Sequence, residues 1–319
     1  CCGILLMVTG LLMIPFCQSV WMLMLFLGII LPAGTGALSF GIAMGAIAPR
    51  LPSNSTSTVS GFVSASSGIG SIVLSPVTQA LIAASGLMGA MIFLSVPTLV
   101  LIPVALWLCR PRAEQEKTPI PKAESQESLK KLFLGAIHNR TYRFLLIGFF
   151  TCGFYMAIIE THLYTQIITY EISEKNAAYA FSIYGLASII GCVLSGIACS
   201  RVQMRQVLGF LYGLRCIIVL TFFLAPKTLL TIYAFTTLLG ITGNSTVPPT
   251  SGLVSRTFGP AKLATLFGIA FLSHQIGSFF SAWLGGVSIS ITGSYTLIWS
   301  TSILLSALAS FVSFRIKEI

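Results

Sequence analysis

The sequence predicts an all-α integral membrane protein, because it is too apolar and too poor in charge for a soluble fold. Of its 319 residues, 55% are hydrophobic and only 8% are charged, and the mean hydropathy is +0.93. A soluble domain carries about 25% charged residues and needs them for its polar exterior. The composition therefore excludes an ordinary cytosolic enzyme, a nucleic-acid-binding domain and a disordered chain.

The apolar residues fall into ten segments that are long enough to be membrane helices. A bilayer core of about 30 Å needs roughly 20 apolar residues per helix. Glycine and proline inside several segments are compatible with this assignment, since neighbouring helices can satisfy the freed backbone groups. The ten predicted segments are 1–17, 20–48, 59–84, 87–109, 144–169, 177–199, 207–224, 228–253, 263–287 and 294–314.

The basic residues indicate the sidedness of these helices. Most of the 18 lysines and arginines lie after even-numbered segments or at the C-terminus, the side that the positive-inside rule places in the cytoplasm. The net charge of +10 is thus a topology signal, and we expect no nucleic-acid partner. The residues on this predicted cytoplasmic side are Arg50, Arg110, Arg112, Lys117, Lys122, Lys130, Lys131, Arg140, Arg143, Arg201, Arg205, Arg256, Lys262, Arg315 and Lys317.

One long polar stretch, 110–143, divides the chain. It contains proline and charges of both signs, which is typical of a cytoplasmic linker, and 128–137 could form a short amphipathic helix against the anionic inner leaflet. The predicted domains are therefore a helical bundle over 1–109, the linker over 110–143, and a second bundle of six helices over 144–319.

An internal repeat relates the two bundles. Gly34 and Arg50 match Gly240 and Arg256 at an offset of 206, and three further glycine pairs match at an offset of 207, namely Gly61 with Gly268, Gly70 with Gly277, and Gly86 with Gly293. Such repeats are typical of secondary transporters. The offset pairs segments seven to ten with one to four and leaves five and six unpaired, and the chain starts with cysteine inside an apolar run. We therefore expect a twelve-helix protein that lacks its first two helices.

Three stretches resemble the major facilitator superfamily, specifically bacterial members akin to its monocarboxylate-porter branch. They are TVPPTSGLVSRTFGPAKLATLFGIAFLSHQIGSFFSAWLGG (246–286), GALSFGIAMGAIAPRLP (36–52) and FTCGFYMAIIETHL (150–163). The resemblance implies a major facilitator fold in which the present segments are family helices 3–6 and 7–12. It also implies a multi-pass inner-membrane protein, a monomer that moves a small organic solute by alternating access, with protons and the lipid bilayer as its other partners.

The resemblance also implies gating residues. The family's loop G-x-x-x-D-R-x-G-R-[KR] corresponds to GIACSRVQMR at 196–205, where Gly196, Arg201 and Arg205 match and Ser200 stands in place of the aspartate. Pro248 and Pro249 in segment eight are the other gating candidates, because adjacent prolines disturb a helix.

Ionisable side chains inside a membrane are costly and are therefore candidates for solute or proton binding. Glu160 and His162 lie in segment five, about 200° apart around a helix, so both cannot face one cavity squarely. His274 and Gln275 lie in segment nine, where histidine can exchange a proton and glutamine can donate to a carboxylate. The alternatives are an outer-end position for Glu160 and packing hydrogen bonds for the histidines.

The polar residues Asn244 and Thr246 precede the two prolines, and we expect freed backbone carbonyls there to face a cavity. Arg215, in segment seven, is a possible carboxylate partner. The alternative is that it snorkels to the cytoplasmic end, some 12 Å away. Ser67 belongs to a serine cluster in segment three whose other interpretation is close helix packing.

We expect that the protein is not an enzyme and that it binds no metal or cofactor. The chain has no aspartate, its eight cysteines form no C-x-x-C pair, and its three histidines show no ligand spacing. A transporter of a monocarboxylate-type anion is the leading interpretation. The alternatives are a broad-range exporter of apolar compounds and a non-transporting truncated remnant, with an integral-membrane enzyme as a distant fourth.

Overall fold

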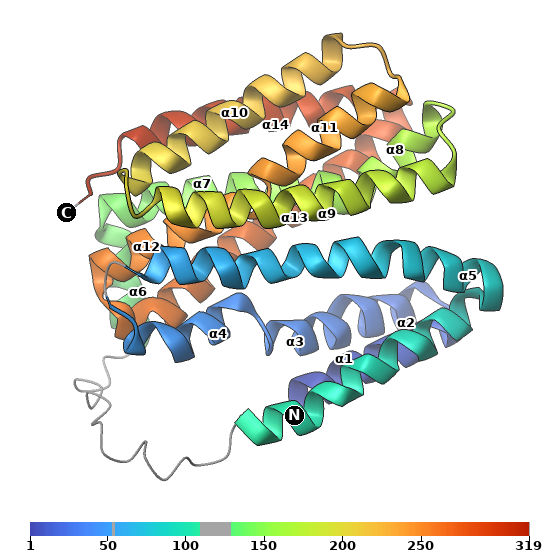
Figure 1. Ribbon diagram of the computed structural model, residues 1–319, viewed down its shortest axis with the longest axis horizontal. Coiled ribbons are helices and arrows are strands. Elements are labelled where there is room, and N and C mark those ends of the chain that lie inside the picture. The colour runs from blue at the N-terminus through green and yellow to red at the C-terminus, as the bar shows by residue number, and fades with distance from the viewer. Residues whose placement is uncertain (53–54, 109–128, 319) are drawn as a thin grey trace. The chain divides into compact units, whose positions relative to one another are not determined.

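The computed structural model describes residues 1–52, 55–108 and 129–318 (Figure 1). Within these ranges the chain forms helices and no strand. The helices are α1 (Cys2–Met13), η1 (Ile14–Phe16), α2 (Val20–Leu25), η2 (Phe26–Ile30), α3 (Leu31–Gly36), α4 (Phe40–Ile47), η3 (Ala48–Arg50), α5 (Thr56–Leu108), α6 (Leu129–His138), α7 (Arg140–Ala157), η5 (Ile158–Leu163), α8 (Tyr164–Thr169), α9 (Glu174–Ala198), α10 (Met204–Leu224), α11 (Leu229–Thr242), η6 (Asn244–Thr246), α12 (Val247–Phe258), η7 (Pro260–Lys262), α13 (Leu263–Thr292) and α14 (Thr296–Phe314).

The predicted all-α membrane class is confirmed. By length and composition, seven helices among the described residues could each cross a membrane. Three features account for the difference from ten predicted segments. Segment one is the shorter apolar helix Cys2–Phe16, segments three and four form the single helix α5 with a kink at Gly86, and segment eight is interrupted between α11 and α12.

The contacts divide the chain into two units. Unit 1 comprises Cys1–Ala43 and Val77–Glu127, and unit 2 comprises Met44–Pro76 and Ser128–Ile319. Residues 44–76, which the sequence analysis places in the first bundle, thus cluster with unit 2. The division of the chain at the 110–143 linker stays a prediction.

Unit 1 is held together by close backbone approach. Helix α1 packs along α3, and a Cβ atom at Gly3 would lie 2.6 Å from the Cβ of Ala37. A Cβ atom at Gly34 would likewise lie 2.6 Å from the backbone nitrogen of Met7. Small residues allow this approach in membrane proteins, where van der Waals packing rather than hydrophobic burial joins helices.

Unit 2 consists of three helix pairs, α7 with α13, α9 with α11, and α10 with α14 (Figure 1). The first half of α5 also belongs to this unit and is joined to it by small polar residues. Thr58 Oγ1 donates to Gly196 O at 3.2 Å, and Ser251 Oγ donates to Ser60 Oγ at 2.7 Å. These contacts fix α5 against α9 and α12.

The predicted linker is described only in part. Residues 110–128 lie outside the described residues. The short helix expected near 128–137 is confirmed as α6, and α7 begins at Arg140, four residues before the predicted segment. Asn139 explains this start, because its side chain accepts a hydrogen bond from Tyr142 N at 3.2 Å and caps the helix.

Two glycines that the repeat pairs both have a positive φ. Gly86 has φ 67° at the kink of α5, and Gly293 has φ 62° where α13 ends. A left-handed φ is costly for any residue with a Cβ atom. Their ψ angles differ, at −177° and 12°, so only the positive φ is common to the two positions, and superposition of the two repeats stays a prediction.

We expect Gly293→Ala to lower the stability of the protein by about 1 kcal/mol, because alanine must adopt the left-handed conformation at the end of α13. The melting temperature in detergent should fall by a few degrees. Gly268→Ala is the matched control, since its Cβ would meet no atom within 4 Å and alanine favours the interior of a helix. Equal melting temperatures for both variants would contradict the assigned backbone strain.

Candidate functional site

The site is built around the interruption of the helix pair α11 and α12 in unit 2. Helix α11 ends at Thr242, Gly243 has φ −55° and ψ −83°, and η6 follows. Pro248 and Pro249 lie in the first turn of α12, where a helix needs no N–H donors. The prolines therefore start a new helix, and the interruption itself lies before them.

Arg215 of α10 occupies the interruption. Its side chain is 0% exposed, and Nη2 donates to both Thr242 O and Gly243 O at 2.5 Å. The structure contradicts the alternative that Arg215 snorkels to the membrane surface, because the two freed carbonyls offer strong acceptors in the interior. The prediction that freed carbonyls face a cavity is corrected as well. Thr242 O and Gly243 O bind Arg215, and Ser245 O accepts from Ser195.

Aromatic rings cover the rest of the Arg215 guanidinium. The guanidinium carbon lies 4.5 Å from the ring centroid of Tyr155 and 5.1 Å from that of Tyr212. Nε and Nη1 have no hydrogen-bond partner, so cation–π attraction is their compensation. Nη2 also lies 3.7 Å from Cys152 Sγ. This cluster joins α7, α10 and α11.

The side chains after the interruption point to three other helices. Asn244 Nδ2 donates to Ser67 Oγ of α5 at 3.2 Å and to Ser188 Oγ of α9 at 3.5 Å. The Thr246 hydroxyl is 3.2 Å from Cys152 Sγ and is fully buried. Asn244 is thus half-buried with an amide directed toward the serines, whereas Thr246 serves as an internal contact.

Glu160 lies in η5, a π-helical turn that continues α7. Insertions of this kind are frequent at functional sites. Glu160 is exposed, and it is close enough to His274, Cys152 and Tyr184 for their charges to interact. The sequence predicts that Glu160, Asn244, His274 and Gln275 lie around one cavity, and the interaction of Glu160 with His274 supports this prediction.

His274 is held in place by α13 and α7. Its Nδ1 lies 3.0 Å from Gln275 Oε1, and its ring stacks on Phe271 with centroids 5.1 Å apart. Close packing puts the backbone of His274 against Gly153, where a Cβ atom would overlap with the carbonyl of His274. The imidazole therefore has a defined orientation, with Gln275 next to it.

His162 lies apart from this cluster. Its Nε2 is 3.2 Å from Ala282 O, and its ring fills the space that Gly285 leaves free. Tyr295 approaches its other side, with ring centroids 5.9 Å apart. His162 is thus a packing residue between η5 and α13.

The predicted gating loop is organised by Glu318. Its carboxylate accepts from the backbone nitrogens of Met204 and Arg205, both at 3.2 Å, and forms an ion pair with Arg256 at 3.1 Å. Glu318 thereby provides an acidic group beside a loop that has Ser200 where the family has aspartate. Burial, together with the nearby Glu318 charge, raises the pKa of the Cys199 thiol to about 12.

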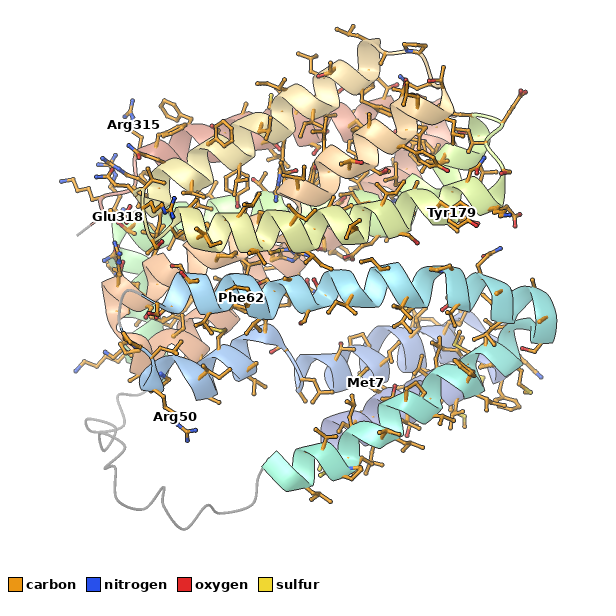
Figure 2. The ribbon with its side chains drawn as sticks, in the orientation of Figure 1. Met7, Arg50, Phe62, Tyr179, Arg315 and Glu318 are labelled. Atoms are coloured by element: carbon orange, nitrogen blue, oxygen red, sulfur yellow. The ribbon has the colours of Figure 1, made fainter. Side chains whose placement is uncertain are left out.

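Of the other predicted gating residues, Arg205 contacts this acidic group through its backbone nitrogen. Gly196 contacts α5 through its carbonyl, and Arg205 donates to Ile316 O at 3.3 Å and to Gln203 Oε1 at 2.8 Å. Arg201 is exposed. Figure 2 shows Arg50, Arg315 and Glu318 at one end of unit 2 and Tyr179 at the opposite end. The assignment of the basic end to the cytoplasm stays a prediction.

Sequence reasoning missed several members of the cluster. The missed residues of α7 are Cys152 and Tyr155. They lie eight and five positions before Glu160, which the sequence did indicate, and a spacing of eight places Cys152 on the same side of the helix as Glu160. This periodicity was the available signal. Tyr184, Ser188 and Tyr212 carried no such signal, since polar and aromatic residues are common in packed membrane helices.

The arrangement can bind an anion and exchange protons. Arg215 is enclosed by carbonyls and aromatic rings, so the groups that remain for a solute are Glu160 and His274, which can exchange protons, and the amides of Asn244 and Gln275. Among the residues that the structure describes, no group of three or more histidine, cysteine or acidic side chains could hold a metal ion.

Comparison with known proteins identifies related chains. The family model of the Major Facilitator Superfamily matches residues 1–236 and, in an overlapping match, 172–316. The chain is 31% identical over 188 residues to an uncharacterized MFS-type transporter, YcxA, of Bacillus subtilis, with 56% of this chain and 46% of that protein covered. It is 25% identical over 325 residues to monocarboxylate transporter 12 of Homo sapiens, with 92% and 62% covered. The chain thus spans about half to just under two thirds of the length of these relatives.

Solved structures show the same fold. The transporter FucP in its outward conformation has a TM-score of 0.71 at 16% identity, with 99% of this chain and 82% of that chain covered. A bacterial homologue of the iron transporter ferroportin, in an outward-facing state, has a TM-score of 0.66 at 12% identity, with 98% and 81% covered.

Proposed function

Because the chain belongs to the Major Facilitator Superfamily, we propose that it transports a small monocarboxylate-type anion together with a proton, by alternating access across the inner membrane. It is a multi-pass membrane protein of a transporter family and not an enzyme.

The juxtaposition of Glu160 and His274 carries this proposal. A carboxylate inside a membrane needs a positive or proton-donating partner, since an unpaired anion in a low dielectric is costly. Protonated His274 can pair with the solute carboxylate, and Gln275 beside it can donate a further hydrogen bond. In this proposal Glu160, whose charge interacts with that of His274, takes up the coupled proton.

The hydrogen bonds of Asn244 support the same assignment. Its amide links the interrupted helix to Ser67 and Ser188, so a solute that competes for this amide would alter contacts between α5, α9 and η6. Such a contact gives the bound solute a route to the conformational change that alternating access requires. The tight contact of Gly196 with α5 and the loop at Glu318 are the proposed gating elements, together with the turn at Pro248 and Pro249.

The relatives support the solute class and the coupling. One relative is named a monocarboxylate transporter, and a structural neighbour is named a fucose:proton symporter, with a TM-score of 0.70 at 14% identity and 99% of this chain covered. These names describe those proteins. For this chain they support an organic solute that moves with protons.

We expect proteoliposomes that contain the protein to accumulate labelled lactate or pyruvate when the outside is made acidic. A gradient of one pH unit corresponds to about 1.4 kcal/mol per proton and supports about tenfold accumulation. Collapse of the gradient with a protonophore should abolish accumulation. Transport of a lipophilic cation without lactate uptake would contradict the proposal and favour the exporter alternative.

A further inference from the structure

An apolar groove on unit 2 lies between α9 and α10, and Ile241 of α11 also lines it. A short turn joins α9 and α10, yet they contact each other little, because α9 packs along α11 and α10 packs along α14. The resulting groove has a volume of about 410 Å³. It is lined by Gly191, Leu194, Ser195, Ala198, Val202, Gln206, Val207, Phe210, Leu211, Leu214 and Ile241.

The walls of the groove are suited to a hydrocarbon chain. Leu194 and Phe210 are 58% and 64% exposed, and such side chains face lipid in a membrane helix. Ser195 offers no free hydroxyl, because its Oγ already donates to Ser245 O. The only other polar lining residue is Gln206, at the basic end of the unit.

The length of the groove matches one leaflet. Along α10 it runs from Gln206 to Leu214, eight residues or about 12 Å. Half of a bilayer core is about 15 Å. An acyl chain that enters from the basic end would therefore fill the groove to near the middle of the membrane.

Two arginines are sequence neighbours of residues at the basic end of the groove, where the lipid headgroup would lie. Arg201 directly precedes Val202 of the groove, and Arg205 directly precedes Gln206. The side chain of Arg205 already donates hydrogen bonds to Gln203 Oε1 and Ile316 O, whereas Arg201 is exposed. The carboxylate of Glu318 accepts hydrogen bonds from the backbone amides at the start of α10. The headgroup site therefore depends on Arg201 and not on the helix terminus.

We propose that this groove binds one anionic phospholipid of the leaflet at the basic end, with an acyl chain between α9 and α10 and its phosphate at Arg201. Basic pockets between membrane helices bind anionic headgroups in this way. The inference is independent of the transported solute, because it concerns the outer face of unit 2.

A second groove on the same helix provides a comparison. It is lined by Leu214, Phe222, Leu238 and neighbouring residues, has a volume of about 250 Å³, and ends near Ala225. Lys227 lies beyond this end, but its Nζ donates to Ala225 O at 2.8 Å and to Phe223 O at 3.4 Å. We therefore expect this groove to take acyl chains without a headgroup preference.

Native mass spectrometry of the purified protein tests the proposal with phosphatidylglycerol and phosphatidylcholine of identical acyl chains. The wild type should retain phosphatidylglycerol preferentially. Arg201→Gln should weaken phosphatidylglycerol binding about fivefold, which equals about 1 kcal/mol for one cation near the headgroups. Ala198→Phe, which fills the groove, should reduce the retention of both lipids.

Arg143→Gln is the matched control, since Arg143 is an exposed arginine of α7 that does not line the groove. It should bind both lipids as the wild type does. Equal retention of the two lipids by the wild type would overturn the proposal, as would an equal loss in Arg143→Gln and Arg201→Gln. A melting temperature that phosphatidylglycerol raises in the wild type and not in folded Arg201→Gln would confirm it independently.

Discussion

His274→Ala is expected to reduce solute binding and uptake by at least about tenfold, because the proposed carboxylate partner is lost. A hydrogen bond to a charged group contributes about 1.5–3 kcal/mol, which corresponds to a factor of roughly 10 to 100 in affinity. The measurements are the Kd of labelled lactate and its initial uptake rate in proteoliposomes. Transport at the wild-type rate by His274→Ala would remove the imidazole from the mechanism.

Glu160→Gln tests the other half of the same mechanism. The amide keeps the shape of the side chain but cannot carry a proton, so solute exchange should persist while accumulation driven by a pH gradient is lost. His162→Gln is the matched control for both variants, because His162 packs against Ala282 O and glutamine can retain a hydrogen bond there. Wild-type accumulation by Glu160→Gln in a pH gradient would contradict its role as the proton carrier.

Arg215→Met is expected to lower stability by about 2–4 kcal/mol, since it leaves the carbonyls of Thr242 and Gly243 without their arginine donor. Methionine replaces the unbranched stem of the arginine side chain as far as Nε and removes the cost of burying its charge. The measured loss of stability therefore reflects the two carbonyls left without a donor and the lost contacts with the aromatic rings. For a unit of this size, the melting temperature should fall by roughly 5–15 °C.

Arg215→Lys should lie between the wild type and Arg215→Met. An ammonium group keeps the charge but lacks the planar fork that stacks between Tyr155 and Tyr212. Melting curves in detergent, followed by tryptophan fluorescence, provide the measurement. An unchanged melting temperature in Arg215→Met would show that Arg215 does not stabilise the helix interruption.

The sequence predicted those features that depend on neighbouring residues. Hydropathy over about 20 residues located the apolar segments, and the run from Asn244 to Pro249 indicated an interruption in segment eight, which the structure places at Gly243–Thr246. The glycine spacing also pairs Gly86 with Gly293, and both have a positive φ in the structure. Helix formation in a membrane is a local requirement, because each backbone group must be satisfied within its own segment.

The partners of the polar side chains were decided by the tertiary structure alone. Arg215 looked able to reach the membrane surface, yet packing directs it to the carbonyls of the interrupted helix. Asn244 meets Ser67, which is 177 positions away, and no local pattern specifies such a contact.

The rotation and the close approach of the helices determine these pairings. The contact of Gly153 with the backbone of His274 fixes α7 against α13, and Gly285 leaves the space that the His162 ring occupies. The sequence by itself therefore determined which residues lie in membrane helices and where one helix is interrupted. Only the packing of the helices decided that Arg215 binds the carbonyls of the interrupted helix and that His162 packs between η5 and α13, because a helix of given hydropathy can rotate to present any of its faces to its neighbours.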